Sequence, residues 1–238
     1  MIRAVFFDFY GTLAEWQPAA GDIQRKSAAA EGVELDSAAI ERAYPVANAL
    51  LDRENALQRL ASRTPEQRES FLTKFEHTLL KTAGYDVPLE TARAIWLRVR
   101  SASKDLILFP DARSTLEELR TMGYSLAVIS NMGADLPSYL ERMGIAGLVT
   151  AAVSSEEVGV AKPHPAMFEA ALRKVGVEAS AAIHVGDGYE SDVLGAASAG
   201  LQALYLQRDA GSTPPGDYPI VRNLSEVPAC VQRLNASA

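Results

Sequence analysis

The sequence predicts an α/β protein in which a parallel sheet is interrupted early in the chain by a long helical insertion. From residue 104 onward, short apolar runs alternate with helix-length segments, which is the pattern of parallel βαβ units. Before that, one apolar run at Ala4–Phe7 stands alone, and the later sheet is the simplest partner for it. We therefore expect residues 1–14 and 104–238 to form one domain, with residues 15–103 inserted in it.

Each expected strand is a short apolar run bounded by turn residues. Ala4–Phe7 runs into a turn that contains Gly11. The later runs of the same character are Ser125–Ile129, Leu148–Val153, Ala182–Val185 and Ala203–Leu206. The Pro- and Gly-rich segment "QRDAGSTPPGDYP" follows the last of these runs and is expected to be a loop.

The inserted segment predicts helices and no strand. Its stretches "SAAIERAYPVANALLDRENALQRL" and "PEQRESFLTKFEHTLLKTAG" carry apolar residues at helical spacing. Thr64-Pro65 is a typical helix start and Gly84 a typical helix end. We expect roughly three to five helices between residues 15 and 103.

Composition and charge limit the classes of protein that fit this chain. Of its 238 residues, 48% are hydrophobic and 22% are charged, as in an ordinary globular protein. The formal net charge of -7 argues against nucleic acid or an anionic membrane as the main partner. No apolar run approaches the roughly 18 residues needed to span a bilayer, and the first residues do not resemble a signal peptide. The one cysteine, Cys230, suits a reducing compartment, so we expect a cytoplasmic protein.

Polar and charged residues follow the expected strands at the edge of the sheet where ligands bind in doubly wound folds. These residues are Asp8, Ser130 with Asn131, Lys162 in "GVAKPHP", and Asp187 with Asp192. Taken singly, each has an ordinary explanation as a helix cap, a turn residue or a solvated lysine. Together they are the groups needed to hold a phosphate beside a divalent cation.

The chemistry expected at this edge is nucleophilic attack by a carboxylate. Neighbouring carboxylates raise each other's pKa, and a cation between them removes that cost. Mg²⁺ suits such oxygen ligands. Asp8 could then attack phosphorus and form an acyl phosphate. Lys162 and the Ser130 hydroxyl would neutralise and hydrogen-bond the phosphoryl oxygens.

These residues, in this order, resemble the haloacid dehalogenase superfamily of hydrolases along the whole chain. "FFDFYGTL" is similar to the first motif of that family, "VISN" to the second, "AKPHP" to the third and "HVGDGYESDVLGA" to the fourth. The resemblance implies a Rossmann-like catalytic core at 1–14 and 104–238. It also implies that residues 15–103 are a mainly helical cap inserted after the first motif.

The resemblance also implies a role for each matched residue. Asp8, Tyr10 and Lys162 would be catalytic. Asp8, the Tyr10 carbonyl and Asp187 would hold Mg²⁺, with Asp192 supporting them. The residues that would contact the phosphate or substrate are Gly11, Thr12, Ser130, Asn131 and Lys162.

Tyr10 leaves two interpretations open. Most phosphatases of this family carry an acid in its place, which protonates the leaving oxygen and later activates water, whereas a phenol with a reference pKa of about 10 is a poor base at neutral pH. Tyrosine is typical of the L-2-haloacid dehalogenases of the family, in which the aspartate attacks carbon and no metal is needed. The fourth motif argues the other way, because "GDGYESD" supplies carboxylates where those dehalogenases have a neutral segment.

We therefore expect a Mg²⁺-dependent phosphatase that acts on a small phosphorylated metabolite through an aspartyl phosphate on Asp8. The alternatives are an L-2-haloacid dehalogenase and a weakly active member that binds a phosphorylated ligand. The expected partner is an anionic small molecule rather than nucleic acid or a membrane, and the protein is expected to be a monomer or homodimer. The acid/base group stays open among Tyr10, a residue of the inserted segment and water at the metal.

Overall fold

The protein is described by a computed structural model that covers residues 1–58, 60–132, 135–208 and 216–236. The chain divides into two compact units, one of Met1–Glu15 with Ile107–Ala238 and the other of Trp16–Leu106. Both connections between the units run through a two-stranded sheet of β2 (Ala14–Gln17) and β3 (Asp105–Leu108). Neither strand was expected from the sequence, because each is four residues long and lacks a clear alternation of apolar and polar residues.

The first unit is built on a six-stranded sheet in the order β5-β4-β1-β6-β7-β8. Its strands are β1 (Ala4–Phe7), β4 (Ser125–Ser130), β5 (Ala151–Ser154), β6 (Ala182–Gly186), β7 (Gln202–Leu206) and β8 (Ile220–Val221). Every pairing in the sheet is parallel, which confirms the predicted α/β class. Phe7 lies beside Val128 on one side and Val185 on the other, so the chain leaves β1 in the middle of the carboxyl edge.

Two strands of this sheet differ from the prediction. The strand expected at Leu148–Val153 begins only at Ala151, because Ala146–Leu148 forms a 3₁₀ turn. β8 was not predicted, since two residues carry no periodic pattern, and it pairs with β7. Residues 209–215 of the predicted Pro- and Gly-rich loop lie outside the described residues.

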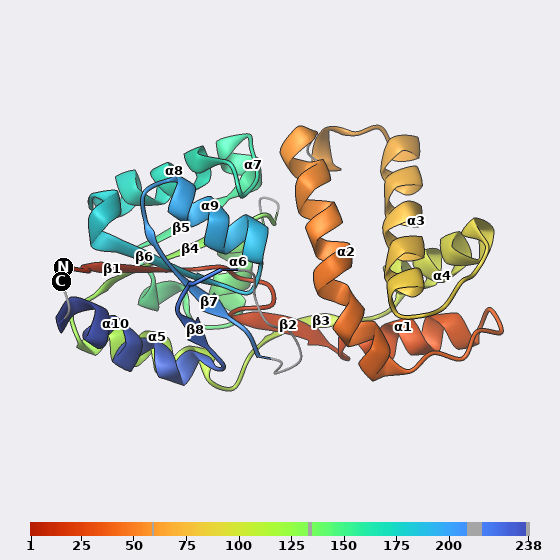
Figure 1. Ribbon diagram of the computed structural model, residues 1–238, viewed down its shortest axis with the longest axis horizontal. Coiled ribbons are helices and arrows are strands. Elements are labelled where there is room, and N and C mark those ends of the chain that lie inside the picture. The colour runs from red at the N-terminus through yellow and green to blue at the C-terminus, as the bar shows by residue number, and fades with distance from the viewer. Residues whose placement is uncertain (59, 133–134, 209–215, 237–238) are drawn as a thin grey trace. The chain divides into compact units, whose positions relative to one another are not determined.

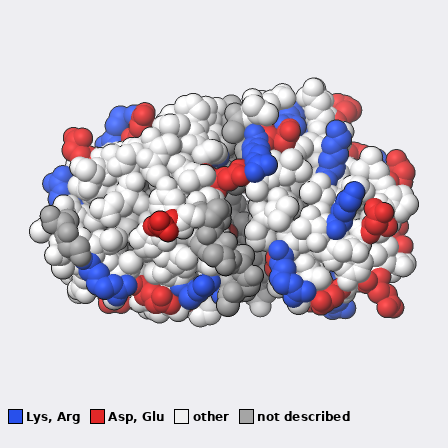
Figure 2. Space-filling model, viewed as in Figure 1, with Lys and Arg blue, Asp and Glu red and all other residues white. Residues whose placement is uncertain are grey.

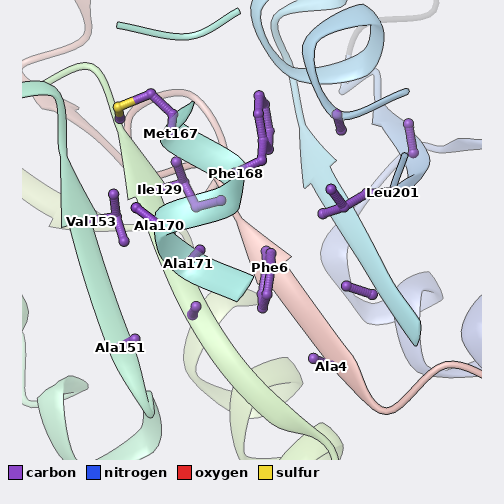
Figure 3. Close-up of a cluster of buried hydrophobic side chains, with 14 of the residues drawn as sticks. Ala4, Phe6, Ile129, Ala151, Val153, Met167, Phe168, Ala170, Ala171 and Leu201 are labelled. Carbon is purple, nitrogen blue, oxygen red and sulfur yellow. The ribbon is translucent and has the colours of Figure 1, made fainter. Parts of the chain in front are cut away.

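Helices cover both faces of the six-stranded sheet (Figure 1). α8 (Pro165–Val175) and α9 (Gly195–Ser198) lie on one face, and α5 (Ala112–Thr121) and α10 (Val227–Ala236) on the other. Two further helices, α6 (Leu136–Arg142) and α7 (Ser155–Val158), flank β5 in the chain. Figure 3 shows Phe6 and Ile129 of the sheet packing against Met167 and Phe168 of α8. Burying such a side chain stabilises the fold by about 1.5–3 kcal/mol, so this core holds the sheet in place beneath its carboxyl edge.

Within the described residues, the second unit contains four α-helices. They are α1 (Ala20–Ala29), α2 (Ser37–Leu57), α3 (Pro65–Thr82) and α4 (Leu89–Ser101). The predicted boundaries of α3 are confirmed, because Thr64 and Gln67 form a capping box and Gly84 takes a φ of 96° just past the helix end. Ile40, Leu80 and Ile95 lie in the apolar core of this unit.

Charged side chains of both signs are interspersed over the face of the molecule that Figure 2 shows. Acidic residues outnumber basic ones in the chain by 30 to 23. In the described part of the chain, we find no helix that is both long and apolar enough to cross a membrane.

A buried polar pair lies inside the helical unit. Gln24 of α1 donates through Nε2 to Oε2 of Glu76 of α3 at 2.9 Å, and both residues are 1% exposed. Among the described residues, the remaining side-chain oxygens of Gln24 and Glu76 have no hydrogen-bond partner. Burial raises the pKa of Glu76 from about 4.5 to about 7, although the hydrogen bond from Gln24 opposes this effect. The folded state therefore favours the neutral acid.

We expect Glu76→Gln to stabilise the protein at pH 8.5 and to have little effect near pH 4.5. Because the pKa of Glu76 is raised in the folded state, the stability that depends on its proton is complete below about pH 4.5 and is lost as the pH rises through about 7. At about 1.4 kcal/mol per pH unit, the gain at pH 8.5 is on the order of 3 kcal/mol. Urea unfolding at both pH values measures the change in the free energy of unfolding. Glu34→Gln, at an exposed position, is the control. An equal gain at both pH values would contradict the explanation.

Candidate active site at the carboxyl edge of the sheet

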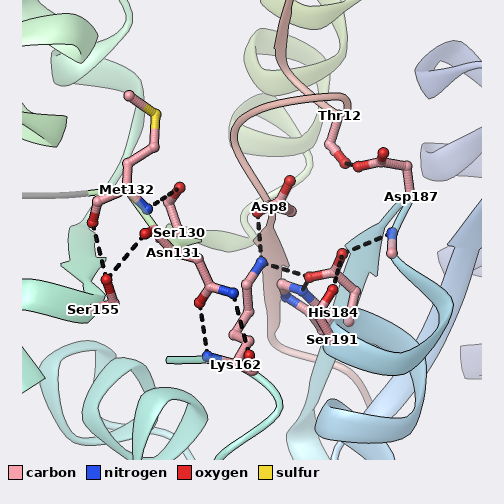
Figure 4. Close-up of polar contacts among 12 residues, drawn as sticks. Asp8, Thr12, Ser130, Asn131, Met132, Ser155, Lys162, His184, Asp187 and Ser191 are labelled. Atoms are coloured by element: carbon pink, nitrogen blue, oxygen red, sulfur yellow. Dashed lines mark hydrogen bonds and ion pairs between the residues drawn. The ribbon is translucent and has the colours of Figure 1, made fainter. Parts of the chain in front are cut away.

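Asp8 lies directly after β1, and its carboxylate faces a buried lysine (Figure 4). Asp8 is 7% exposed and Lys162 is 2% exposed. Lys162 Nζ donates to Asp8 Oδ1 and to Asp192 Oδ1, each at 2.5 Å. Asp8 Oδ2 accepts no hydrogen bond from the described residues. One oxygen of Asp8 is therefore held in place, while the other is available to a ligand.

Asp192 is held by four donors. Its Oδ1 is contacted by Lys162 Nζ and by His184 Nε2 at 2.9 Å. Its Oδ2 accepts from the backbone N–H of Gly188 at 2.9 Å and from the Ser191 hydroxyl at 3.5 Å. Protein donors thus occupy both oxygens, which suits Asp192 to anchor Lys162 rather than to bind a ligand directly.

Asp187 lies next to the loop that follows β1. Its Oδ1 accepts from the Thr12 hydroxyl at 2.9 Å. A Cβ placed on Gly11 would lie 2.3 Å from Asp187 Oδ2, and Gly11 has a φ of 86°. Space and backbone conformation therefore both require glycine at this position. The Gly11-Thr12 segment of the first motif positions the carboxylate of the fourth.

Ser130 and Asn131, which we expected to contact phosphate, take part in loop structure here. Asn131 Oδ1 accepts from the Lys162 backbone N–H at 2.7 Å, and Nδ2 donates to the Lys162 carbonyl at 3.2 Å. Ser130 Oγ accepts from the backbone N–H of Met132 at 3.2 Å. Asn131 therefore holds the main chain that carries Lys162. Whether either residue also contacts phosphate stays a prediction.

Burial and mutual repulsion decide the charge of the site. Burial raises the pKa of Asp8 well above its ordinary value although Lys162 opposes this, and burial together with Asp192 raises the pKa of Asp187 to about 7. For Asp192 burial favours the neutral acid, but Lys162 and His184, through their charges and hydrogen bonds, together outweigh burial and lower the pKa. For Lys162 the two carboxylates outweigh burial and raise the pKa, so the lysine stays charged. Burial lowers the pKa of His184 and favours its neutral form.

The donor set of this site fits a divalent cation. Asp8, Asp187 and Asp192 each offer a carboxylate oxygen, and these atoms lie within 4.8 Å of one another. Lys162 pairs with Asp8 and Asp192, and the half-buried Asp187 adds a third carboxylate beside them, so the fully ionised group carries an excess of negative charge in a largely buried place. A hard cation such as Mg²⁺ prefers oxygen ligands of this kind. Because Asp192 is already occupied by donors, Asp8 and Asp187 are the better candidate ligands.

The structure thus brings together five of the predicted residues: Lys162 donates to Asp8 and Asp192, Thr12 donates to Asp187, and oxygens of the three carboxylates lie within 4.8 Å of one another. Gly11 adjoins that group, whereas Tyr10 forms an isolated backbone bridge with Ala14. From the sequence, His184 was interpreted as a core or rim histidine within an apolar strand and not as a site residue, and the structure places its Nε2 2.9 Å from Asp192 Oδ1. The hydrogen bond from the Gly188 amide to Asp192 could not be predicted from the sequence, because it depends on a π-helical turn at Tyr189–Leu194.

Comparison with known proteins places the chain in a family. The family model for haloacid dehalogenase-like hydrolases matches residues 2–200. The glyceraldehyde 3-phosphate phosphatase of Methanothermobacter thermautotrophicus is 32% identical over 212 residues, which cover 88% of this chain and 87% of that protein. The haloacid dehalogenase-like hydrolase domain-containing protein 3 of Danio rerio is 38% identical over 128 residues, and the match spans 52% of this chain and 53% of that protein, about half of each.

A solved structure of similar fold is the 2-haloacid dehalogenase of Pseudomonas syringae pv. Tomato DC3000, with a TM-score of 0.59 and 27% identity. That comparison covers 98% of this chain and 100% of the dehalogenase. A dehalogenase thus shares the fold that carries the carboxylates of this site. Because the family model spans most of the chain, including the segments that supply Asp8, Lys162 and Asp187, the chain belongs to the haloacid dehalogenase-like hydrolases.

Proposed function

We propose that this hydrolase is a cytoplasmic, Mg²⁺-dependent phosphatase that acts on a small phosphorylated metabolite. The observation that carries the proposal is the excess of carboxylates over lysine in the buried site. An anionic substrate would be repelled there unless a divalent cation offset the charge. A dehalogenase of this family needs no metal, so the second carboxylate at Asp187 would have no purpose in it. The phosphatase named among the relatives supports the same choice.

Asp8 is the nucleophile in this proposal. Lys162 holds Oδ1, so Oδ2 is the oxygen that attacks phosphorus in line with the leaving oxygen. The bond from phosphorus to the leaving oxygen breaks, and an aspartyl phosphate forms on Asp8. Water then attacks phosphorus, which releases inorganic phosphate and restores the carboxylate.

Asp8, Asp187 and the Tyr10 carbonyl would hold the Mg²⁺ ion. When bound, Mg²⁺ supplies positive charge that stabilises the phosphoryl oxygens as the negative charge on them shifts. Lys162 supplies the second positive charge. Asp192 keeps the lysine in place, since Asp192 is itself fixed by His184 and the Gly188 amide.

We expect the wild-type protein to prefer aryl phosphates over alkyl phosphates by about 10²-fold or more, because Tyr10 replaces the acid that protonates the leaving oxygen. A general acid contributes about 10²–10⁴-fold, and an aryl group with an acidic phenol does not need it. Tyr10→Asp should narrow the margin by accelerating alkyl substrates most. The ratio of kcat/KM values for p-nitrophenyl phosphate and an alkyl phosphate measures this margin. Efficient wild-type hydrolysis of an alkyl phosphate would mean that another residue donates the proton.

A panel of phosphorylated metabolites with chloroacetate and 2-chloropropionate, each tested with Mg²⁺ and with EDTA, tests the proposed function. Phosphate release that requires Mg²⁺ is the expected result. Halide release that EDTA leaves unchanged would overturn the proposal in favour of the dehalogenase, which Tyr10 alone would favour. Binding of a phosphorylated ligand without release of phosphate or halide would instead support a binding protein.

A further inference from the structure

Arg208, just after β7, binds two segments of the chain beside the site. Its Nη1 and Nη2 donate to the two carboxylate oxygens of Asp111 at 3.0 and 3.1 Å. Nη2 also donates to the Thr12 carbonyl at 2.9 Å. The guanidinium lies over the Phe109 ring, with Cζ 3.8 Å from the ring centroid. No step of the proposed mechanism uses this arginine.

Thr12 connects Arg208 to the site. The carbonyl of Thr12 accepts from Arg208, and its hydroxyl donates to Asp187 Oδ1 at 2.9 Å. Thr12 is fully buried, and the adjacent Gly11 leaves no room between its backbone and the Asp187 carboxylate. A shift of the Thr12 backbone would therefore move the donor that orients Asp187.

Asp111 anchors Arg208 to the rest of the first unit. Its Oδ2 also accepts from the backbone N–H of Leu224 at 2.8 Å. Lysine could not replace Arg208, because only the planar guanidinium can bind both oxygens of a carboxylate and donate to a carbonyl from one fixed position. A lysine ammonium carries the same charge on one nitrogen at the end of a flexible chain, so it cannot hold these acceptors in one fixed arrangement.

We propose that Arg208 is a positioning residue that acts through Thr12 on Asp187, and so sets the affinity of the site for Mg²⁺. The metal part of this inference rests on the proposed function. Mutating a group that orients a metal ligand typically weakens metal binding by about 10–100-fold. Since one residue intervenes between Arg208 and Asp187, we expect the lower end of that range.

Arg208→Lys in the full chain tests the proposal, with Arg113→Lys as a matched control. Like Arg208, Arg113 joins segments of the first unit through its guanidinium. It donates to the backbone carbonyls of Met143 and Gly144, which do not belong to the site. Calorimetric titration with Mg²⁺ should give a Kd about tenfold higher for Arg208→Lys than for wild type. Hydrogen exchange of residues 9–14, measured without Mg²⁺, should become faster. Both quantities should be unchanged in Arg113→Lys.

Thr12→Val separates a positioning role from a general structural one, because it removes the hydroxyl and keeps the carbonyl. In that background, Arg208→Lys should weaken Mg²⁺ binding little further, since the link to Asp187 is already cut. A tenfold loss in both backgrounds, or unchanged exchange of residues 9–14, would overturn the proposal. If Mg²⁺ bound to no variant, including wild type, the proposed function would fail. The exchange rates would still decide whether Arg208 orders the loop that carries Thr12.

Discussion

We expect Asp8→Asn to abolish turnover without lowering the melting temperature. The amide has nearly the shape of the carboxylate but is not a nucleophile, so kcat should fall by at least about 10³-fold. Stability should be equal or higher, because burial and the neighbouring carboxylates already raise the pKa of Asp8 and make its charge unfavourable. A neutral side chain removes that repulsion.

Turnover of p-nitrophenyl phosphate with Mg²⁺ and the melting temperature together check this prediction. Asp105→Asn, at an exposed position in β3, is the control and should match wild type in both measurements. A variant that keeps substantial activity would show that Asp8 is not the nucleophile. A variant that loses activity and also melts much earlier would show that the Asp8 charge stabilises the fold, against the charge distribution described above.

Lys162→Met is expected to lower both stability and rate. It leaves the Asp192 carboxylate, whose charged form Lys162 stabilises, buried without that cation, and breaking such a buried pair costs about 3–5 kcal/mol. The rate should fall by about 10²–10³-fold, as when a donor to the reacting oxygens is removed. Urea unfolding in EDTA measures the first effect, and Mg²⁺-supported turnover measures the second.

Lys174→Met is the matched control for this variant. Lys174 pairs with Glu157 at the surface, where a salt bridge contributes about 1 kcal/mol or less. Loss of this salt bridge in Lys174→Met should leave the rate unchanged. If Lys162→Met lost activity while keeping wild-type stability in EDTA, then Lys162 would act on substrate alone and would not hold the carboxylates together.

The sequence by itself determined the class of the fold and the place of the candidate site. Alternating apolar runs and helix-length segments are local patterns, so they predicted the parallel sheet before any contact was known. The start of α3 at Thr64-Pro65 was predictable for the same reason, because a capping box lies within a few residues. Asp8 could be placed at the carboxyl edge because it directly follows the first strand.

Only the tertiary structure decided which partner each polar group has. Asp8 meets Lys162 across 154 residues of chain, and Arg208 meets Thr12 across 196. Asp187 and Asp192 are alike in the sequence. Four protein donors bind Asp192, whereas Asp187 accepts from the Thr12 hydroxyl and packs closely against Gly11. Residue type and spacing say which groups can ionise or donate. Burial and the donors that reach each carboxylate set its pKa and its role, and these depend on how distant segments pack.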